Sequence, residues 1–297
     1  MGSTNSFMPA SVEAPVTGNK WWALWLTMRP WNLLMIVFTM IIIRERLIPA
    51  DDISDGLFFL SVLAMTAAAA GGNLINDYFD IREDLINKPR KALVGRVIKR
   101  RWVLGAHHLL SATALACAGA MTWLAKDWRY VLWMAGLIAL LWAYSPTFKR
   151  RFLAGNFVIA LSVGQLPLWT ALPSDQTSST ILLAYAVLSA AITWLRELTK
   201  DLQDIDGDTR AGFDTLPVRW RERRTLLLLK ILHLAFWPLL AFAAFWLYSL
   251  CGMTWHNLLF LMPFAGATYM IFHPNVRAVS AYLKVTLGGG VAVLIWL

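Results

Sequence analysis

Residues 57–84 read LFFLSVLAMTAAAAGGNLINDYFDIRED, an apolar run that leads directly into a cluster of acidic residues. About 20 apolar residues are needed to cross the hydrocarbon core of a bilayer, so residues 57–75 are expected to form a transmembrane helix. Only helices or closed barrels satisfy the backbone in lipid, and this run lacks the alternating pattern of barrel strands. The stretch therefore predicts an all-α membrane fold.

The composition extends this prediction to the whole chain. Of its 297 residues, 58% are hydrophobic and only 15% are charged, which is too apolar for a soluble domain of this size. Further apolar runs bring the expected number of transmembrane helices to nine. They lie at about 21–43, 57–75, 102–124, 130–143, 152–172, 181–195, 226–250, 258–272 and 278–297.

The net charge of +9 is interpreted as membrane topology rather than as a nucleic-acid surface. Lys and Arg concentrate in alternate connections, chiefly 76–101, 149–151 and 196–225. The positive-inside rule therefore predicts that these connections and the N-terminus are cytoplasmic. Four crossings separate the two long connections, so both must share one membrane face.

The remaining organisation is simple. Residues 1–19 are polar and small, and they are expected to be a disordered tail before a single transmembrane domain at 20–297. Cys117 and Cys251 lie in or beside different apolar runs, so neither a disulfide framework nor a zinc site is supported. The five histidines show no ligand spacing with acidic residues.

The first long connection carries an acidic stripe. If the preceding helix continues, Asn76, Asp80 and Asp84 are spaced i, i+4 and i+8 and share one face, with Asp77 beside it. Carboxylates at this spacing repel one another, and a helix tolerates them best when a cation lies between them. Oxygen ligands of this kind suit Mg²⁺.

The second long connection repeats the arrangement, because Glu197, Asp201, Asp204 and Asp208 also follow helical spacing. Mg²⁺ is usually held by one or two carboxylates together with substrate phosphates, so a phosphorylated substrate is predicted. Basic residues stand beside both stripes and are expected to bind phosphate oxygens: Lys88, Arg90, Lys91, Arg196, Lys200 and Arg210.

These segments resemble the two aspartate-rich motifs of the UbiA superfamily of intramembrane prenyltransferases. NDYFDIRED at 76–84 is similar to the first, NDxxDxxxD, and KDLQDIDGD at 200–208 is similar to the second, DxxDxxxD. The resemblance covers nearly the whole chain and includes RPWN at 29–32, YSPTFKR at 144–150 and the pair Gly155-Asn156. Within the superfamily, RELTKDLQDIDGDTRAGFDTLP most resembles the digeranylgeranylglyceryl phosphate synthase branch. The chain departs from many relatives at 90–93, where RKAL replaces an Arg-Pro-Leu-like element.

The resemblance implies nine helices around a central cavity with cytoplasmic helical caps. It implies two Mg²⁺ ions, one on Asn76, Asp80 and Asp84 and one on Asp204 and Asp208, with support from Asp77 and Asp201. The aspartates of the two metal sites, together with Tyr144 and Lys149, are the expected catalytic residues. Residues expected to bind or line the substrates are Arg29, Asn32, Tyr144, Lys149, Lys88, Arg90, Arg196 and Lys200.

The implied reaction is transfer of a long prenyl group, expected from geranylgeranyl diphosphate, to a glycerol phosphate lipid precursor through an allylic carbocation. An aromatic or tetrapyrrole acceptor is the alternative within the same chemistry. A cation-coupled transporter would place its acids near the bilayer midplane, and the motif order of a CDP-alcohol phosphotransferase is not present. Lys284 is isolated in the last apolar run, where it is expected to snorkel or meet a carboxylate rather than to act in catalysis. Prenyl length, the general base and the oligomeric state stay open.

Overall fold

The computed structural model describes residues 18–87, 92–174, 179–251, 261–273, 275–293 and 295. The expectations for Lys88, Arg90 and Lys91, and for residues 1–17 of the predicted tail, lie outside these ranges. Asn19 does not belong to a tail, because its side-chain oxygen accepts hydrogen bonds from the backbone amides of Trp21 and Trp22 and caps the first helix.

The described residues form helices throughout, and their only strand-like pairing is an isolated bridge between Val94 and Ile98. The all-α prediction is confirmed. In chain order the helices are α1 Lys20–Thr27, α2 Pro30–Leu47, α3 Asp55–Phe79, α4 Ile81–Asn87, α5 Arg100–Ala125, α6 Arg129–Ala143, η1 Tyr144–Phe148, α7 Ala154–Gly164, α8 Leu166–Ala171, α9 Ser179–Gln203, α10 Ile205–Ala211, α11 Leu216–Cys251, α12 Leu261–Phe272 and α13 Val276–Val293.

The long helices are apolar enough to cross a membrane. Six described helical stretches pass by length and hydropathy, and the bent pair α1 and α2 would make a seventh. The run expected at 152–172 is divided into α7 and α8, of 11 and 6 residues, and the described part of α12 has 12 residues. The coarse prediction of a polytopic membrane protein is therefore supported, while the count of nine stays a prediction.

The first expected span, at 21–43, is bent rather than straight. Helices α1 and α2 meet at an angle of 47° around Arg29, which adopts a left-handed conformation with φ of 60°. Pro30 follows it at the start of α2, where the missing amide hydrogen costs no helical hydrogen bond. A left-handed arginine is unfavourable by itself, so the surrounding contacts must hold this corner.

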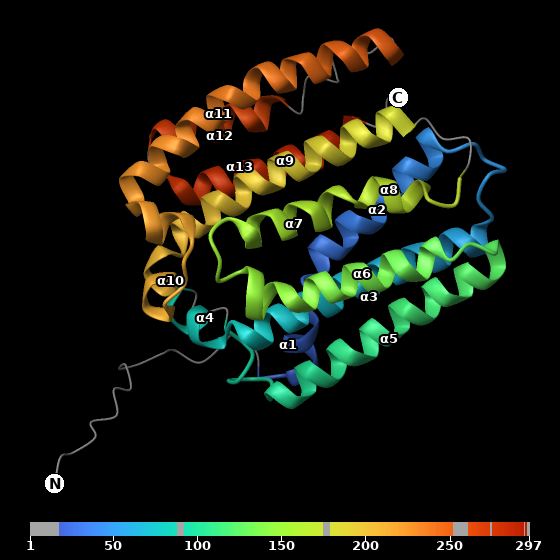
Figure 1. Ribbon diagram of the computed structural model, residues 1–297, viewed down its shortest axis with the longest axis horizontal. Coiled ribbons are helices and arrows are strands. Elements are labelled where there is room, and N and C mark those ends of the chain that lie inside the picture. Colours follow the sequence, from blue (N-terminus) through green and yellow to red (C-terminus); the bar gives the residue numbers. More distant parts are fainter. Residues whose placement is uncertain are drawn as a thin grey trace.

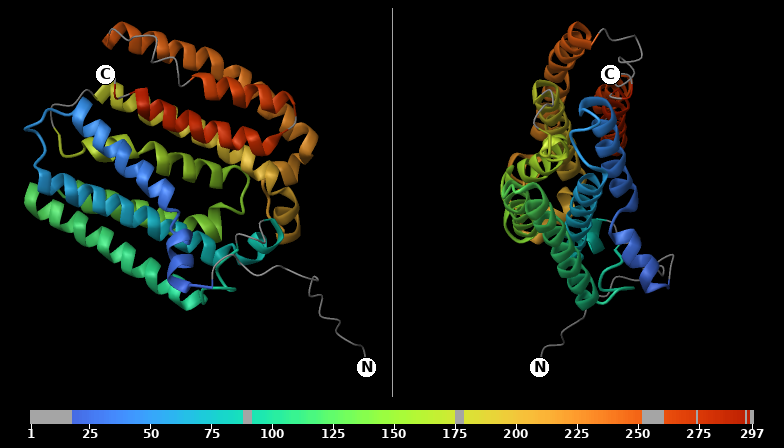
Figure 2. Two further views of the ribbon diagram at one scale, coloured as in Figure 1. Left: turned by 180° about the vertical axis from the view of Figure 1, so that it is seen from behind. Right: turned by 90° about the vertical axis from the view of Figure 1, so that its right-hand side faces the viewer.

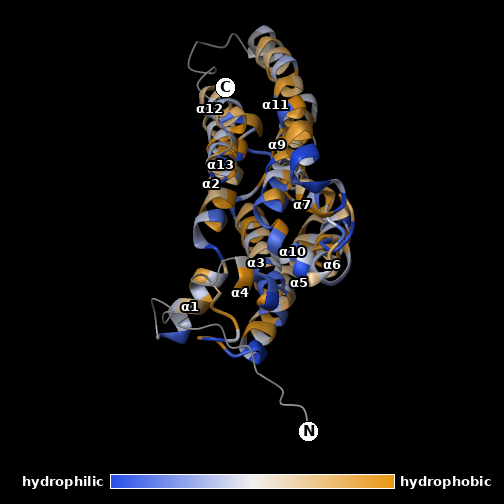
Figure 3. Ribbon diagram, turned by 90° about the vertical axis from the view of Figure 1, so that its left-hand side faces the viewer, coloured by the Kyte–Doolittle hydropathy of each residue, from blue (hydrophilic) through white to orange (hydrophobic). Residues whose placement is uncertain are grey.

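The outer surface of the bundle is apolar. Large side chains such as Phe242, Phe245 and Met262 are at least two-thirds exposed, as lipid-facing residues are expected to be. Tryptophans near helix ends, among them Trp31, Trp123 and Trp128, are exposed in the same way, which is typical of an aromatic belt. Hydrophilic stretches gather toward the end of the bundle that carries α4 and α10 (Figure 3).

The interior contains two large hydrophobic clusters rather than one. The first joins residues of α2, α3, α5, α6 and α8, and the second joins residues of α9, α11, α12 and α13. The long helices lie side by side, and the short helices α4 and α10 lie together at one end (Figures 1 and 2). This arrangement brings the acidic ends of α3 and α9 to the same end of the molecule.

Candidate functional site

The first acidic segment lies where α3 meets α4. The helix breaks at Asp80, which has φ of −85° and ψ of 8°, so the predicted continuous stripe is interrupted there. The helical hydrogen bonds nevertheless continue, since the Asp80 amide donates to the Asn76 carbonyl and the Asp84 amide donates to the Asp80 carbonyl, at 3.0 and 2.8 Å. Asn76, Asp80 and Asp84 therefore keep nearly the spacing that the sequence predicts.

The second acidic segment has the same construction. Helix α9 breaks at Asp204, with φ of −99° and ψ of 9°, and α10 begins at the next residue. The Asp204 amide donates to Lys200 and the Asp208 amide donates to Asp204, both at 3.0 Å. Two segments that are 124 positions apart thus end their long helices in the same local way.

A single cavity of about 1260 Å³ unites the predicted residues. Its far walls are apolar and include Met35, Leu137, Leu166 and Leu240, while the acids and bases gather at its other end. Most predicted site residues that the structure describes line it: Arg29, Asn32, Asn76, Asp77, Asp80, Asp84, Tyr144, Lys149, Arg196, Lys200, Asp201, Asp204 and Asp208. Arg210, which was expected to bind phosphate oxygens, is exposed on α10 and is not among the lining residues. A polar head with an apolar tail matches this division of the walls.

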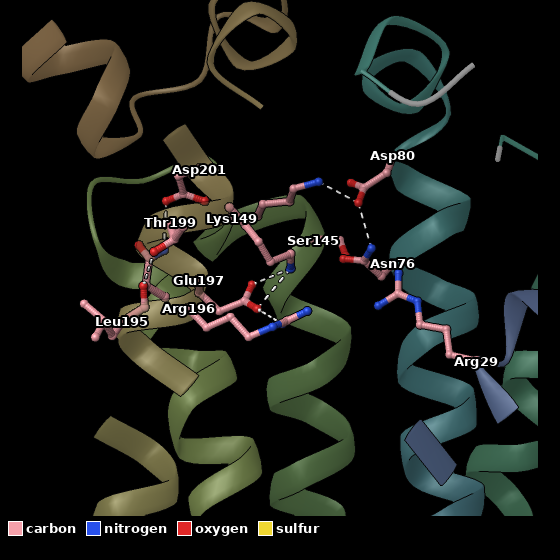
Figure 4. Close-up of polar contacts among 12 residues, drawn as sticks. Arg29, Asn76, Asp80, Ser145, Lys149, Leu195, Arg196, Glu197, Thr199 and Asp201 are labelled. Carbon is pink, nitrogen blue, oxygen red and sulfur yellow. Dashed lines mark hydrogen bonds and ion pairs between the residues drawn. The ribbon is translucent and has the colours of Figure 1, made fainter. Parts of the chain in front are cut away.

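Lys149 reaches toward the first acidic segment from the middle of the site (Figure 4). Its ammonium lies 2.5 Å from Asp80 Oδ2, which also accepts a hydrogen bond of 2.7 Å from the Asn76 side chain. Burial alone would lower the pKa of Lys149, but the charges of Asp80, Asp84 and Asp208 outweigh it and raise that pKa. The lysine is therefore a cation that acts on carboxylates of both segments.

A wide helical turn positions Lys149. Residues Tyr144–Phe148 form a π-helical turn, closed by a hydrogen bond of 2.8 Å from the Lys149 amide to the Tyr144 carbonyl. Such turns are rare and often occur at functional sites. Gly155 of α7 packs against this turn so closely that a Cβ there would lie 2.9 Å from Lys149 Cα and 3.3 Å from the Tyr144 ring. The Gly155-Asn156 pair thus lets α7 approach the site.

Asp208 is buried, with 4% of its surface exposed, and accepts a hydrogen bond of 3.1 Å from the Thr215 hydroxyl. Burial raises its pKa to about 6, although Lys149 and the Thr215 hydrogen bond act in the opposite direction. No ion pair to it is found in the part of the chain that the structure describes. A carboxylate held this way favours the arrival of a cation.

The left-handed Arg29 corner is tied to the first acidic segment. Arg29 donates a hydrogen bond of 2.8 Å to Asp77, and the Asn73 side chain donates one of 2.9 Å to the Met28 carbonyl. These two bonds join the bend between α1 and α2 to α3, which accounts for the strained backbone. Asp77 is engaged by Arg29, in keeping with the supporting role expected for it.

Glu197 organises the basic residues of α9. This buried carboxylate lies 3.0 Å from Arg196 and 2.8 Å from Lys200 (Figure 4). Arg196 keeps one further donor, since its buried Nε has no hydrogen-bond partner. Asp201 accepts a hydrogen bond of 2.8 Å from Asn156, which fits its expected supporting role.

The donor set fits Mg²⁺ in one particular way. The ligands are carboxylate and amide oxygens, the type that this ion prefers. No group of three His, Cys, Asp or Glu residues in the described ranges is close enough to hold a metal by itself. A metal held here would need further ligands besides these side chains, and the two-ion arrangement stays a prediction.

Several residues in or beside the cavity were given no role from the sequence. Ser145 donates to the Asn76 side chain at 3.2 Å, and Asn156 and Thr215 hold aspartates of the second segment. Glu83 lines the cavity while buried, and its Oε2 has no hydrogen-bond partner. Its position beside Asp84 is the only sequence signal that points to it. Among the described residues, Lys284 pairs with no carboxylate; it donates a hydrogen bond of 2.9 Å to the Asn32 side chain.

Comparison with known proteins agrees with this geometry. The model of the UbiA prenyltransferase family matches residues 33–281, most of the chain. The chain belongs to the UbiA prenyltransferase family. The predicted superfamily resemblance is confirmed, and membership together with the long apolar helices indicates an integral membrane protein.

Two similar sequences are both digeranylgeranylglyceryl phosphate synthases. The chain is 35% identical over 168 residues to the digeranylgeranylglyceryl phosphate synthase of Natronomonas pharaonis, covering 56% of this chain and 58% of that protein. It is 32% identical over 180 residues to the synthase of Sulfolobus acidocaldarius, covering 59% and 62%. The matched region thus spans less than two thirds of these relatives, and the expected branch resemblance is borne out.

Solved UbiA-family structures share the fold. A structure of a digeranylgeranylglyceryl phosphate synthase superposes with a TM-score of 0.66 at 22% identity, covering 93% of this chain and 97% of that one. A UbiA homolog from Archaeoglobus fulgidus bound to DMAPP and Mg²⁺ gives 0.61 at 18% identity, covering 93% and 99%. At these identities the likeness concerns the fold alone.

Proposed function

We propose that the chain catalyses Mg²⁺-dependent transfer of a long prenyl group, from an allylic diphosphate such as geranylgeranyl diphosphate, to a glycerol phosphate lipid precursor. The observation that carries the proposal is the single cavity in which both acidic segments, the interleaved bases and a long apolar wall meet. Family membership and the names of the similar sequences support the same reaction.

The diphosphate head would lie between the two acidic segments. Asn76, Asp80 and Asp84 would hold one Mg²⁺, and Asp204 and Asp208 the other. When bound, these ions would neutralise charge that develops on the leaving diphosphate. Lys149 and Lys200 line the same region and would bind diphosphate oxygens that the metals leave uncovered.

The reaction exchanges one C–O bond for another. The bond between C1 of the prenyl chain and the diphosphate oxygen breaks, its electron pair leaves with the diphosphate, and an allylic cation forms. The acceptor hydroxyl oxygen then bonds to C1, and its proton passes to a carboxylate of the second segment or to the diphosphate. Positive side chains fixed near the leaving group stabilise this charge separation without reorganising.

The apolar part of the cavity would hold the prenyl tail. Side chains from α2, α6, α8 and α11, such as Ile36, Leu141, Pro167 and Leu240, line it. An environment without water protects the allylic cation from hydrolysis. Transfer to an aromatic or tetrapyrrole acceptor would use the same wall and the same head site, so it is the second candidate.

The proposal also concerns the orientation of the protein in the membrane. The basic connections at the acidic end favour a cytoplasm-facing site and a cytoplasmic N-terminus, in a single domain over 20–297. Labelling of single cysteines placed at 151 and 128 in sealed vesicles would test this orientation. Cytoplasmic access to position 128 and not to 151 would contradict it.

The activity is tested directly with purified protein in detergent. Geranylgeranyl diphosphate and Mg²⁺ are combined with geranylgeranylglyceryl phosphate, homogentisate or a chlorophyllide, and products are identified by mass spectrometry. Transfer to the glycerol phosphate acceptor supports the first candidate. Transfer only to an aromatic or tetrapyrrole acceptor supports the second, and no transfer to any acceptor removes both.

A further inference from the structure

Lys284 is a cation in the spanning helix α13 that lines the cavity, and no carboxylate among the described residues pairs with it. Its ammonium donates to the neutral Asn32 side chain at 2.9 Å. The charged groups near enough to act on it are Arg196 and Arg29, both of them cations, within the residues that the structure describes. An ionisable group inside a membrane is costly unless it has a functional partner, so an uncompensated cation here indicates a place for an anion.

The charged side chains around Lys284 also carry more positive than negative charge. The Glu197 carboxylate forms ion pairs with both Arg196 and Lys200, and the Asp77 carboxylate forms one with Arg29. With Lys200 assigned to the diphosphate, Arg29, Arg196 and Lys284 share the charges of Asp77 and Glu197, and one positive charge remains. Arg196 also keeps a buried Nε without a hydrogen-bond partner on the cavity wall. Both charge and donors are therefore available to a ligand.

This cationic region is separate from the place proposed for the diphosphate. Arg196 precedes Asp204 by eight residues, which corresponds to about 12 Å along a helix. One diphosphate head does not span both regions, so the surplus charge fits a second anionic group.

We propose that Lys284, together with Arg196 and Asn32, binds the phosphate monoester of the acceptor lipid. The inference rests on the proposed function and names the group that the site recognises on its second substrate. A phosphate monoester carries close to two negative charges and three acceptor oxygens, which suits the Lys284 ammonium together with the unused Nε donor of Arg196. Lys284 is then a specificity residue that holds the acceptor and takes no part in bond exchange.

The test compares Lys284→Met with Lys284→Arg and with Lys230→Met. Lys230 is a suitable control, since it also lies in a spanning helix, over the Phe272 ring, but does not line the cavity. The Michaelis constants are measured for geranylgeranylglyceryl phosphate, for the phosphate-free geranylgeranylglycerol and for geranylgeranyl diphosphate.

We expect Lys284→Met to raise the KM for the phosphorylated acceptor about tenfold or more, the effect of one lost charged hydrogen bond. Its KM for the diphosphate and for the phosphate-free acceptor should stay within about twofold of wild type, since neither contacts Lys284 in this assignment. Lys284→Arg should restore most of the affinity, and Lys230→Met should resemble wild type.

Two failures are distinguishable. Wild-type protein that transfers prenyl groups to no glycerol phosphate acceptor overturns the proposed function, and this inference with it. Wild-type activity on that acceptor, with an unchanged acceptor KM in Lys284→Met or an equal rise for the phosphate-free acceptor, overturns the assignment of Lys284 alone.

Discussion

Lys149 interacts with carboxylates of both acidic segments. The spacing of residues in the sequence does not predict these interactions. Its partner Asp80 is 5% exposed, so the ion pair is mostly removed from water. Breaking a buried pair leaves one charge without compensation, which costs more than removing both members. The residue thus contributes to the stability of the folded site.

We expect Lys149→Met to lower the free energy of unfolding by about 1–3 kcal/mol, less than for a fully buried pair because the lysine is partly exposed. The double variant Lys149→Met, Asp80→Asn should recover part of this loss, since no unpaired charge remains. Thermal unfolding in detergent measures both. Additive losses in the double variant would show that the pair is not coupled.

Asp208 should make metal binding depend on pH. Its pKa is raised to about 6, so the metal-free folded protein binds a proton more tightly than the unfolded chain does. This contribution to stability is fully present below about pH 4, the ordinary aspartate pKa, and is lost as pH rises through 6. The charged groups acting on it are Lys149, Asp204 and Asp80.

Because Mg²⁺ must displace this proton, its apparent affinity in the presence of a non-reactive prenyl thiolodiphosphate should fall as pH is lowered from 7.5 to 5.5. Isothermal titration calorimetry at both pH values checks this. In Asp208→Asn the dependence should become smaller, leaving the part due to the diphosphate. An identical pH dependence in wild type and variant would assign the proton elsewhere.

At the level of elements, the two acidic segments are built alike. Each long helix breaks at its central aspartate, Asp80 or Asp204, and a short helix follows while the i to i+4 hydrogen bonds continue. The sequence spacing predicted which residues share a face. It did not predict the breaks, because a change of backbone direction at one residue is decided by what packs there, here α4 against α10.

The π-helical turn gives the clearest prediction at this scale. Gly155→Ala would place a methyl group 2.9 Å from Lys149 Cα, so the turn must move away from α7. We expect turnover to fall about tenfold or more, because small displacements of a positioned group are costly to catalysis.

Gly136→Ala in α6 is the matched control, since a Cβ there meets nothing within 4 Å. It should keep wild-type activity, and both variants should remain folded by thermal unfolding. Equal activity in the two alanine variants would show that the position of the turn does not affect turnover.

For the whole molecule, the apolar runs and charge pattern predicted a helical membrane protein, and the acidic spacing together with the family resemblance predicted many residues that line its cavity. These patterns do not predict which side chains of distant helices pair with one another. Lys149 and Asp80 are 69 positions apart, and Lys284 meets Asn32 across 252 positions, so tertiary packing alone decides these pairs. The division of the run at 152–172 into α7 and α8 was not predicted either, because composition gives apolar length while the interruption at Gln165 is local.

Mg²⁺ and the diphosphate should stabilise the folded protein when they bind together. The described residues offer no metal site complete without phosphate oxygens, so Mg²⁺ alone should hardly change the unfolding temperature. Mg²⁺ with the thiolodiphosphate analogue should raise it by several degrees, as expected for saturating ligand that binds only the folded state. A full shift with Mg²⁺ alone would contradict the shared coordination.

The most direct test of the central claim is the dissociation constant of geranylgeranyl thiolodiphosphate, measured for wild type, Asp80→Asn and Asp208→Asn, each with Mg²⁺ and with EDTA. If both segments bind one head group, wild type should bind the analogue tightly only with Mg²⁺. Each variant should then lose about tenfold or more in affinity. Binding that is indifferent to Mg²⁺, or that survives unchanged in either variant, would contradict a shared metal and diphosphate site.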